Sequence, residues 1–153
     1  MGAVISMRIL SLLIGLVLSF QVFAKTEIMV FVSFSMPNSS LVKLSHDIQK
    51  VNGVLILKGH GDGSKGMVMN DIYKILNLTK GGFIFRPDLF KELDIKVAPT
   101  FVIANFDGMQ RVRSFDKLVG NVSLEYVLGT FTKRGEHQRD ARILLKKFRG
   151  GRV

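Results

Sequence analysis

Cysteine is absent from this sequence of 153 residues. Its absence excludes disulfide bonds, thiolate metal sites and catalysis by a thiol. The fold must then be stabilised by a hydrophobic core. Residues 25–153 are enough for a single domain that buries roughly two-thirds of the surface of its unfolded chain. The sequence shows no internal repeat and no low-complexity linker.

The apolar run near the N-terminus is too short to span a bilayer comfortably. It covers residues 9–24 without a charge, whereas a membrane-spanning helix needs about 20 residues. Arg8 before the run, and Val22, Phe23 and Ala24 before a polar segment, are typical of a secretory signal peptide. We expect residues 1–24 to be a signal peptide cleaved after Ala24, so that the mature chain lies in the periplasm. The alternative is an uncleaved N-terminal anchor.

Acidic residues are few, 12 against 22 lysines and arginines, which gives a net charge of +10. The excess lies mainly near the C-terminus. Residues 25–132 carry 13 basic and 10 acidic side chains, a net charge of +3, whereas residues 133–153 carry 8 and 2, a net charge of +6. This distribution argues against a basic groove across the domain and makes nucleic acid the least favoured partner.

Residues 133–153 are therefore assigned to a basic C-terminal tail, separate from a domain at 25–132. Apolar residues recur in the tail at helical spacing: Ala141, Leu144, Leu145 and Phe148. A short basic amphipathic helix over 139–149 can lie on an anionic membrane surface or dock against an acidic partner. The alternative is a solvated and frayed terminus.

The first half of the domain reads as a βαβ unit. The apolar run at 28–32 has the length and composition of a buried strand. A helical face then follows, made of Leu41, Leu44, Ile48 and Val51. Asn52 and Gly53 end that helix, and a second buried strand covers 54–57. Such a unit places its two strands parallel.

The second half predicts a helix at 67–78, a short strand at 83–85 and a short helix at 87–93. Strands at 100–104 and 109–113 flank an Asp-Gly turn and predict a hairpin. Ser123 is placed to cap a last helix with an apolar face, formed by Leu124, Val127, Leu128 and Phe131. Together these elements predict an α/β domain with a central mixed sheet and helices on both faces.

This order of elements resembles the thioredoxin-like fold. Residues 35–38, Ser-Met-Pro-Asn, stand where that fold carries its Cys-x-x-Cys motif, so the proline is kept and both sulfurs are missing. Residues 96–102 resemble the segment that carries the fold's cis-proline, here Pro99. The resemblance implies a cis Ala98–Pro99 bond beside residues 35–37.

The sequence Phe-Val-Ser-Phe-Ser-Met-Pro at residues 31–37 resembles the opening motif of one family in particular, the type-F conjugative pilin assembly protein TrbC. Further similar segments lie at 55–59, 87–90, 97–102 and 120–123, and the resemblance spans about residues 28–131. It implies an exported accessory protein for pilus assembly in a conjugative type IV secretion system. Other envelope proteins of the transfer system, of the TraW type, are the implied partners.

The resemblance also implies a protein-binding surface where the two loops meet, formed by Phe34, Ser35, Met36, Pro37, Asn38, Ala98, Pro99 and Thr100. The competing interpretation of residues 33–39 is a serine nucleophile, at Ser33 or Ser35. A nucleophilic serine needs a general base, and neither His46, inside a helix, nor His137, in the tail, is an obvious partner. We therefore expect no catalytic residue, and expect Ser35, Asn38 and Ser39 to cap the helix and form its turn.

No cofactor or metal is expected either, because His60 and Asp62 have no third ligand nearby. The favoured function is a binding adaptor or chaperone without redox activity. The alternatives are a degenerate chaperone related to thiol-disulfide isomerases, and a basic envelope protein whose tail binds membrane or nucleic acid.

Overall fold

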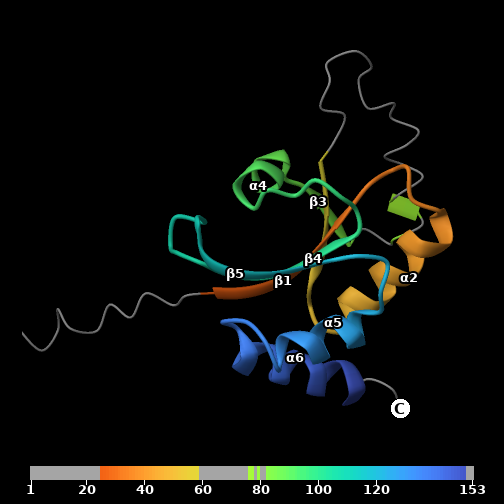
Figure 1. Ribbon diagram of the computed structural model, residues 1–153. Helices are drawn as coiled ribbons and strands as arrows, with labels where there is room; N and C mark the ends of the chain where they lie inside the picture. Colours follow the sequence, from red (N-terminus) through yellow and green to blue (C-terminus); the bar gives the residue numbers. More distant parts are fainter. Residues whose placement is uncertain (1–24, 59–75, 78, 80–81, 151–153) are drawn as a thin grey trace, which may run out of the picture.

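The computed structural model describes residues 25–58, 76, 77, 79 and 82–150 (Figure 1). The expected signal peptide, His60, Asp62 and most of the expected helix at 67–78 lie outside these residues. In chain order the elements are β1 (Lys25–Val32), α2 (Asn38–Gln49), β2 (Val54–Leu57), β3 (Phe83–Phe85), α4 (Pro87–Glu92), β4 (Thr100–Phe106), β5 (Val112–Val119), α5 (Leu124–Phe131) and α6 (Gln138–Gly150).

The strands form one mixed sheet in the order β3-β2-β1-β4-β5. Strands β1, β2 and β3 are parallel neighbours, whereas β4 runs antiparallel to both β1 and β5. The βαβ unit and the mixed sheet predicted from the sequence are thus confirmed. The parallel strands end at the same edge of the sheet, which is where the candidate site lies.

Helices cover both faces of the sheet, with α4 above it and α5 and α6 below it in Figure 1. Because side chains alternate along a strand, β1 supplies both cores. Ile28, Val30 and Val32 join the core beneath α2, α5 and α6. Met29 and Phe31 join the core beneath α4, where the Phe31 ring meets Phe90 edge-on at 4.9 Å between centroids.

Helix α2 follows its predicted apolar face but not its predicted start. Leu41, Leu44 and Ile48 are buried, as the spacing indicates. The helix begins after Pro37, and no side chain caps it. The expected capping by Ser35, Asn38 and Ser39 is therefore wrong. The Pro37 carbonyl accepts the first N–H groups, from Ser40 and Leu41, at 3.0 and 3.2 Å.

The β4–β5 hairpin turns later than the sequence predicts. The expected second strand at 109–113 was wrong in position, because β5 begins only at Val112. The Asp107 carboxylate accepts hydrogen bonds from the backbone N–H groups of Met109 and Arg111, both at 2.9 Å. These bonds close a turn over residues 107–111, since an aspartate that binds the backbone just after it stabilises a turn rather than a strand.

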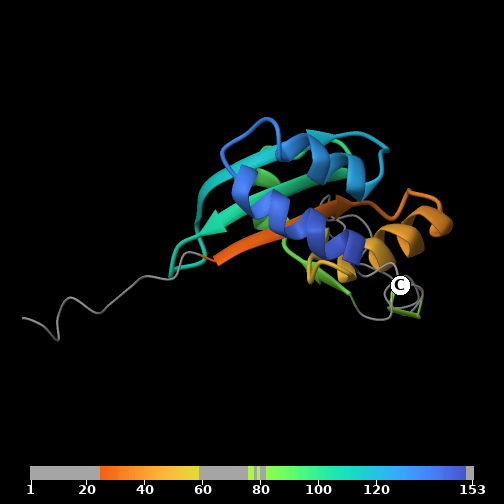
Figure 2. The same ribbon diagram turned by 90° about the horizontal axis from the view of Figure 1, so that it is seen from below.

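Helix α6 belongs to the folded domain. Ala141 and Phe148 are buried in the same core as α2 and α5, and Figure 2 shows the three helices side by side on this face of the sheet. The boundary expected at residue 132 therefore differs from the structure. Apolar spacing predicted the buried side of α6, but not that the domain itself would cover it.

The connection to α6 is attached to β5. The Asp116 carboxylate accepts the backbone N–H groups of Glu136 and His137 at 3.0 and 2.8 Å, and the buried His137 ring lies 3.1 Å from the Ser114 hydroxyl through Nε2. Within the described ranges, no helix combines the length and apolar character needed to cross a bilayer.

Candidate functional site

A cavity of about 410 Å³ lies at the carboxyl ends of β1 and β2. We call it the strand-end cavity. Three parts of the chain line it. The first is Val32–Ser35 at the end of β1, and the second is Leu57 and Lys58 at the end of β2. The third is Phe90 of α4 together with residues 95–98, which precede β4. In α/β sheets this edge is a common place for binding sites, because loops from neighbouring strands converge there.

Ser33 shapes the first loop. Its carbonyl accepts the N–H of Met36 at 3.1 Å, and its hydroxyl accepts the N–H of Ser35 at 3.3 Å. The two serine hydroxyls lie 2.9 Å apart. Ser35 is exposed, whereas Phe34 and Met36 are half-buried against the core beneath α2. The apolar groups of this loop are thus shared between the core and the surface.

The second loop contains the cis Ala98–Pro99 bond that the resemblance implied. Pro99 is buried, and its carbonyl accepts the N–H of Gly120 at 3.1 Å. Thr100 is 1 % exposed, and its hydroxyl donates to the Val97 carbonyl at 2.6 Å. Pro99 and Thr100 therefore hold the loop in place, while Val97, with 56 % of its surface exposed, faces solvent.

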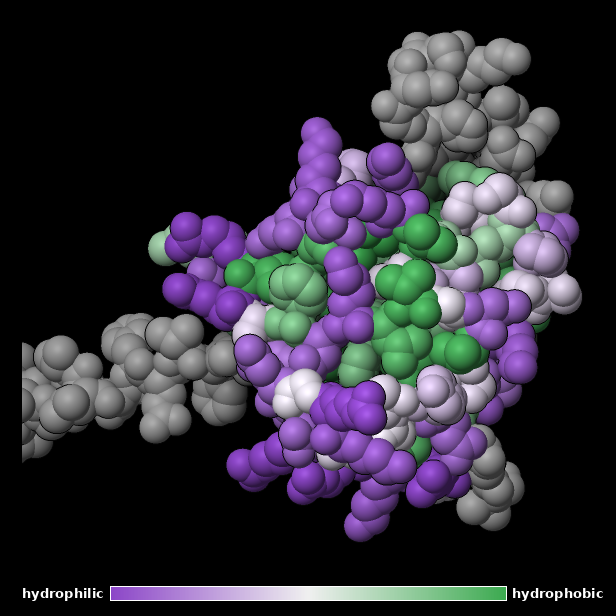
Figure 3. Space-filling view, in the orientation of Figure 1, coloured by the Kyte–Doolittle hydropathy of each residue, from purple (hydrophilic) through white to green (hydrophobic). Residues whose placement is uncertain are grey.

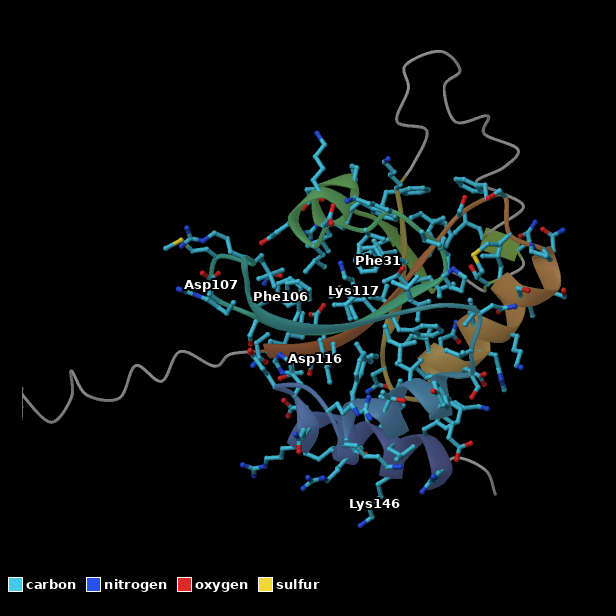
Figure 4. The ribbon with its side chains drawn as sticks, in the orientation of Figure 1. Phe31, Phe106, Asp107, Asp116, Lys117 and Lys146 are labelled. Atoms are coloured by element: carbon cyan, nitrogen blue, oxygen red, sulfur yellow. The ribbon has the colours of Figure 1, made fainter. Side chains whose placement is uncertain are left out.

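Lys117 of β5 supports the same loop from below. Its ammonium donates to the carbonyls of Leu93 and Asp94 at 3.0 and 3.2 Å. In Figure 4 Lys117 points toward α4, whereas the adjacent Asp116 points toward the helices below the sheet. Successive residues of one strand, Asp116 and Lys117, thus hold the α6 connection on one face and the cavity loop on the other.

The structure brings together only part of the surface expected from the sequence. Phe34, Ser35 and Ala98 line the strand-end cavity. Met36, Pro37 and Asn38 are outside its lining, the last two exposed where α2 begins. Eight lining residues are not part of the expected surface, namely Val32, Ser33, Leu57, Lys58, Phe90, Ile95, Lys96 and Val97. Their position just after a strand, or just before the expected cis-proline, was the signal that could have identified Lys58, Lys96 and Val97.

The strand-end cavity has apolar walls and a cationic rim. Its charged lining residues are Lys58 and Lys96. The Lys96 ammonium lies 3.2 Å from the exposed Asp94 carboxylate. In the adjacent turn, the Arg86 guanidinium donates to Asp88 and holds the pKa of that carboxyl below its usual value. Figure 3, in the orientation of Figure 1, shows apolar side chains gathered in the middle of the molecule's front face, with hydrophilic side chains around them.

The described residues do not assemble a serine hydrolase at this cavity. His46 is exposed on α2 beside Asp47, and His137 is buried against Ser114 on the other face of the sheet. Ser114, His137 and Asp140 have the order of a catalytic triad, but His137 Nδ1 is 3.8 Å from the Asp140 carboxylate and the ring is only 3 % exposed. This group attaches α6 to β5. No metal-binding group of three His, Asp or Glu occurs in the described part of the chain.

Comparison with known families decides the relationship of the chain. The model of the type-F conjugative transfer system pilin assembly protein family, TrbC, matches residues 30–131. The chain belongs to this family. The match covers the sheet from β1 to β5 and the helices up to α5, and it confirms the resemblance of the motif at 31–37. Membership connects the chain with F-type conjugative pilus assembly and implies other components of the transfer system as partners.

Similarity to a solved thioredoxin structure confirms the thioredoxin-like fold. The exposed lipoprotein thioredoxin Etrx1 of Streptococcus pneumoniae is 14 % identical, with a TM-score of 0.51 over 72 % of this chain and 86 % of that one. A secreted Mycobacterium tuberculosis disulfide oxidoreductase homologous to Escherichia coli DsbE is 13 % identical, with a TM-score of 0.41 over 82 % and 81 % of the two chains. Among curated proteins there is no significant match.

Proposed function

We propose that this TrbC-family chain is a non-enzymatic adaptor that holds a segment of another transfer protein in the strand-end cavity during F-type pilus assembly. The observation that carries the proposal is the cavity itself, built by the loop after β1 and the loop before β4. Its volume of about 410 Å³ is in the range of binding pockets. Seven of its eleven lining residues are apolar, which suits the side chains of a protein segment.

The cavity lies beside the position at which thioredoxin-like enzymes carry their redox cysteines, but this chain has no redox group there. The chain has no cysteine, and Ser35 and Asn38 occupy the positions of the two sulfurs in the thioredoxin-like pattern. Thiol-disulfide exchange requires a thiolate, so this surface can bind a partner but cannot exchange disulfides with it. The lack of a thiol supports the proposed adaptor or chaperone role.

The proposal places the protein in the periplasm, exported by the signal peptide at 1–24. An envelope protein of the TraW type is the proposed partner, because the family resemblance implies it. Binding of α6 to an anionic membrane is less well supported. A helix that lies in a bilayer interface buries its apolar side in lipid, whereas Ala141 and Phe148 of α6 are already buried in the domain.

Genetic complementation tests this function. In a transfer-competent host whose own copy of the gene is deleted, the wild-type gene should restore pili and DNA transfer. Val97→Glu places a charge on the exposed wall of the cavity, so we expect fewer pili and reduced transfer. Val97 has 56 % of its surface exposed, so this substitution should leave the stability of the fold within about 0.5 kcal/mol.

Met109→Glu is the matched control. Met109 is 76 % exposed at the β4–β5 turn and is not among the residues that line the strand-end cavity. The same change there should leave pili and transfer unaffected. Normal pili in the deletion strain would overturn the assembly role. Normal pili with Val97→Glu would overturn only the use of this cavity.

A further inference from the structure

A second recess lies between α5 and α6, the two helices that lie below the sheet in Figure 1. We call it the α5–α6 groove. It consists of two adjoining cavities of about 780 and 610 Å³ that share Thr132, Leu145 and Arg149. The sequence analysis assigned the charges of 133–153 to a separate tail. In the structure α6 packs against α5, and several of these charged side chains line the groove between the two helices.

The groove is strongly cationic. Among the described residues, its lining contains one carboxylate, that of Glu125, and five cations: Lys133, Arg134, Arg142, Lys146 and Arg149. Arg149 pairs with Glu125 at 2.9 Å. Among the described residues, none of the other four cations takes part in a salt bridge. Figure 4 shows Lys146 pointing away from the domain into solvent.

The floor of the groove is small and apolar. Leu145 is half-buried there, and Gly129 of α5 has no side chain. A Cβ added to Gly129 would have nothing within 4 Å. Tyr126, which is 59 % exposed, stands on the rim. The groove therefore has an open apolar seat surrounded by positive charge.

We infer that the α5–α6 groove binds an acidic amphipathic segment of a partner protein. An apolar side chain of the segment sits at Gly129 and Leu145, and its carboxylates pair with the cations of the rim. A bilayer surface would not find the apolar side of α6 free, because Ala141 and Phe148 are buried in the domain. Single-stranded nucleic acid is held by stacking on aromatic side chains as well as by charge. Among the described residues that line the groove, Tyr126 is the one aromatic residue. The inference does not depend on the strand-end cavity.

Binding of a fluorescein-labelled peptide rich in Glu with interspersed Leu tests the inference, measured by anisotropy with the purified full chain. We expect binding that weakens as salt is added. Replacing Glu by Gln, or Leu by Ser, in the peptide should each weaken it. Lys133→Glu with Arg134→Glu should weaken binding about tenfold, since two attractive pairs become repulsive.

Gly129→Leu separates a seated segment from diffuse attraction between charges. The substitution fills the seat without changing any charge, and leucine favours a helix more than glycine does, so the fold should be retained. We expect several-fold weaker binding. The matched control is Gly108→Leu, since a Cβ there also meets nothing within 4 Å. The charge control is Lys43→Glu with Lys91→Glu, two exposed positions on α2 and α4.

Three results would overturn the inference. One is wild-type binding of the peptide by Gly129→Leu. Another is an equal loss in the Lys43/Lys91 control, which would mean that total charge alone matters. The third is binding of anionic phosphatidylglycerol vesicles or a single-stranded oligonucleotide without binding of the peptide. Pilus defects in Val97→Glu are a separate readout, so failure here and failure of the proposed function are distinguishable.

Discussion

Phe148→Ala tests whether α6 is part of the domain. Phe148 is 3 % exposed within the core beneath α2 and α5. Removing a buried phenylalanine side chain typically costs about 3–5 kcal/mol, through lost burial and the cavity left behind. The Lys50 ammonium also lies 5.2 Å from the centre of the ring, an interaction worth about 0.5–1 kcal/mol near a surface.

The loss should be a large part of the total, because a domain of this size unfolds with a free energy of about 5–15 kcal/mol. Urea unfolding followed by circular dichroism measures it. Ile143→Ala is the matched control, since Ile143 lies on the same helix with 59 % of its surface exposed. That substitution should change stability by no more than about 0.5 kcal/mol.

Phe148→Leu keeps most of the volume and should cost less than about 1.5 kcal/mol, so it remains measurable if Phe148→Ala fails to fold. Equal stabilities for Phe148→Ala and Ile143→Ala would refute the packing of α6. The residues after 132 would then be the separate tail that the charge distribution indicates.

Three other substitutions test local features. Ser123→Ala should lower stability by about 1 kcal/mol, since the Ser123 hydroxyl accepts the N–H of Tyr126 in the first turn of α5. Ser123→Asp should retain this stability in thermal melts, and an equal loss in both variants would contradict the cap. Gly53→Ala should cost about 1–3 kcal/mol because its Cβ would lie 2.6 Å from the Ile28 carbonyl oxygen, whereas Gly129→Ala should stabilise α5 by about 0.5–1 kcal/mol. The backbone N–H groups of Arg111 and Met109 lower the pKa of Asp107. Its contribution to stability is therefore complete above the usual aspartate pKa and is lost as pH falls through the lowered value. Asp107→Asn should weaken this acid dependence, and melting curves of identical pH dependence for variant and wild type would refute it.

The order of elements could be predicted because it depends on local patterns. Continuous apolar runs predicted β1 and β2, and the spacing of Leu41, Leu44 and Ile48 predicted the buried side of α2. Ser123 was correctly predicted as a cap, since capping needs only a side chain three residues from a free N–H. The absence of cysteine alone ruled out thiol chemistry, and the motif at 31–37 predicted the family.

The composition of the binding surfaces was decided by tertiary contacts. The resemblance to the thioredoxin-like fold predicted that Ala98–Pro99 lies beside residues 35–37. It did not predict that Thr100 would be buried while Val97 faces solvent. The Asp107 turn, which the sequence analysis misplaced, sets the start of β5. Because a one-position shift along a strand moves each side chain to the other face of the sheet, this turn also decides which side chains of β5 face the cavity loop.

The fate of the C-terminal residues shows the same division. Periodicity determines which side of α6 is apolar, but it cannot determine what covers that side. The domain covers it because Asp116 and Ser114 of β5 hold the start of α6. Phe148 enters a core that includes residues of β1, α2 and β2, more than 90 positions earlier. Only the folded chain brings such distant residues together. The sequence therefore determined the charge and the apolar spacing of residues 139–149, and the tertiary structure decided that these residues form one wall of a groove.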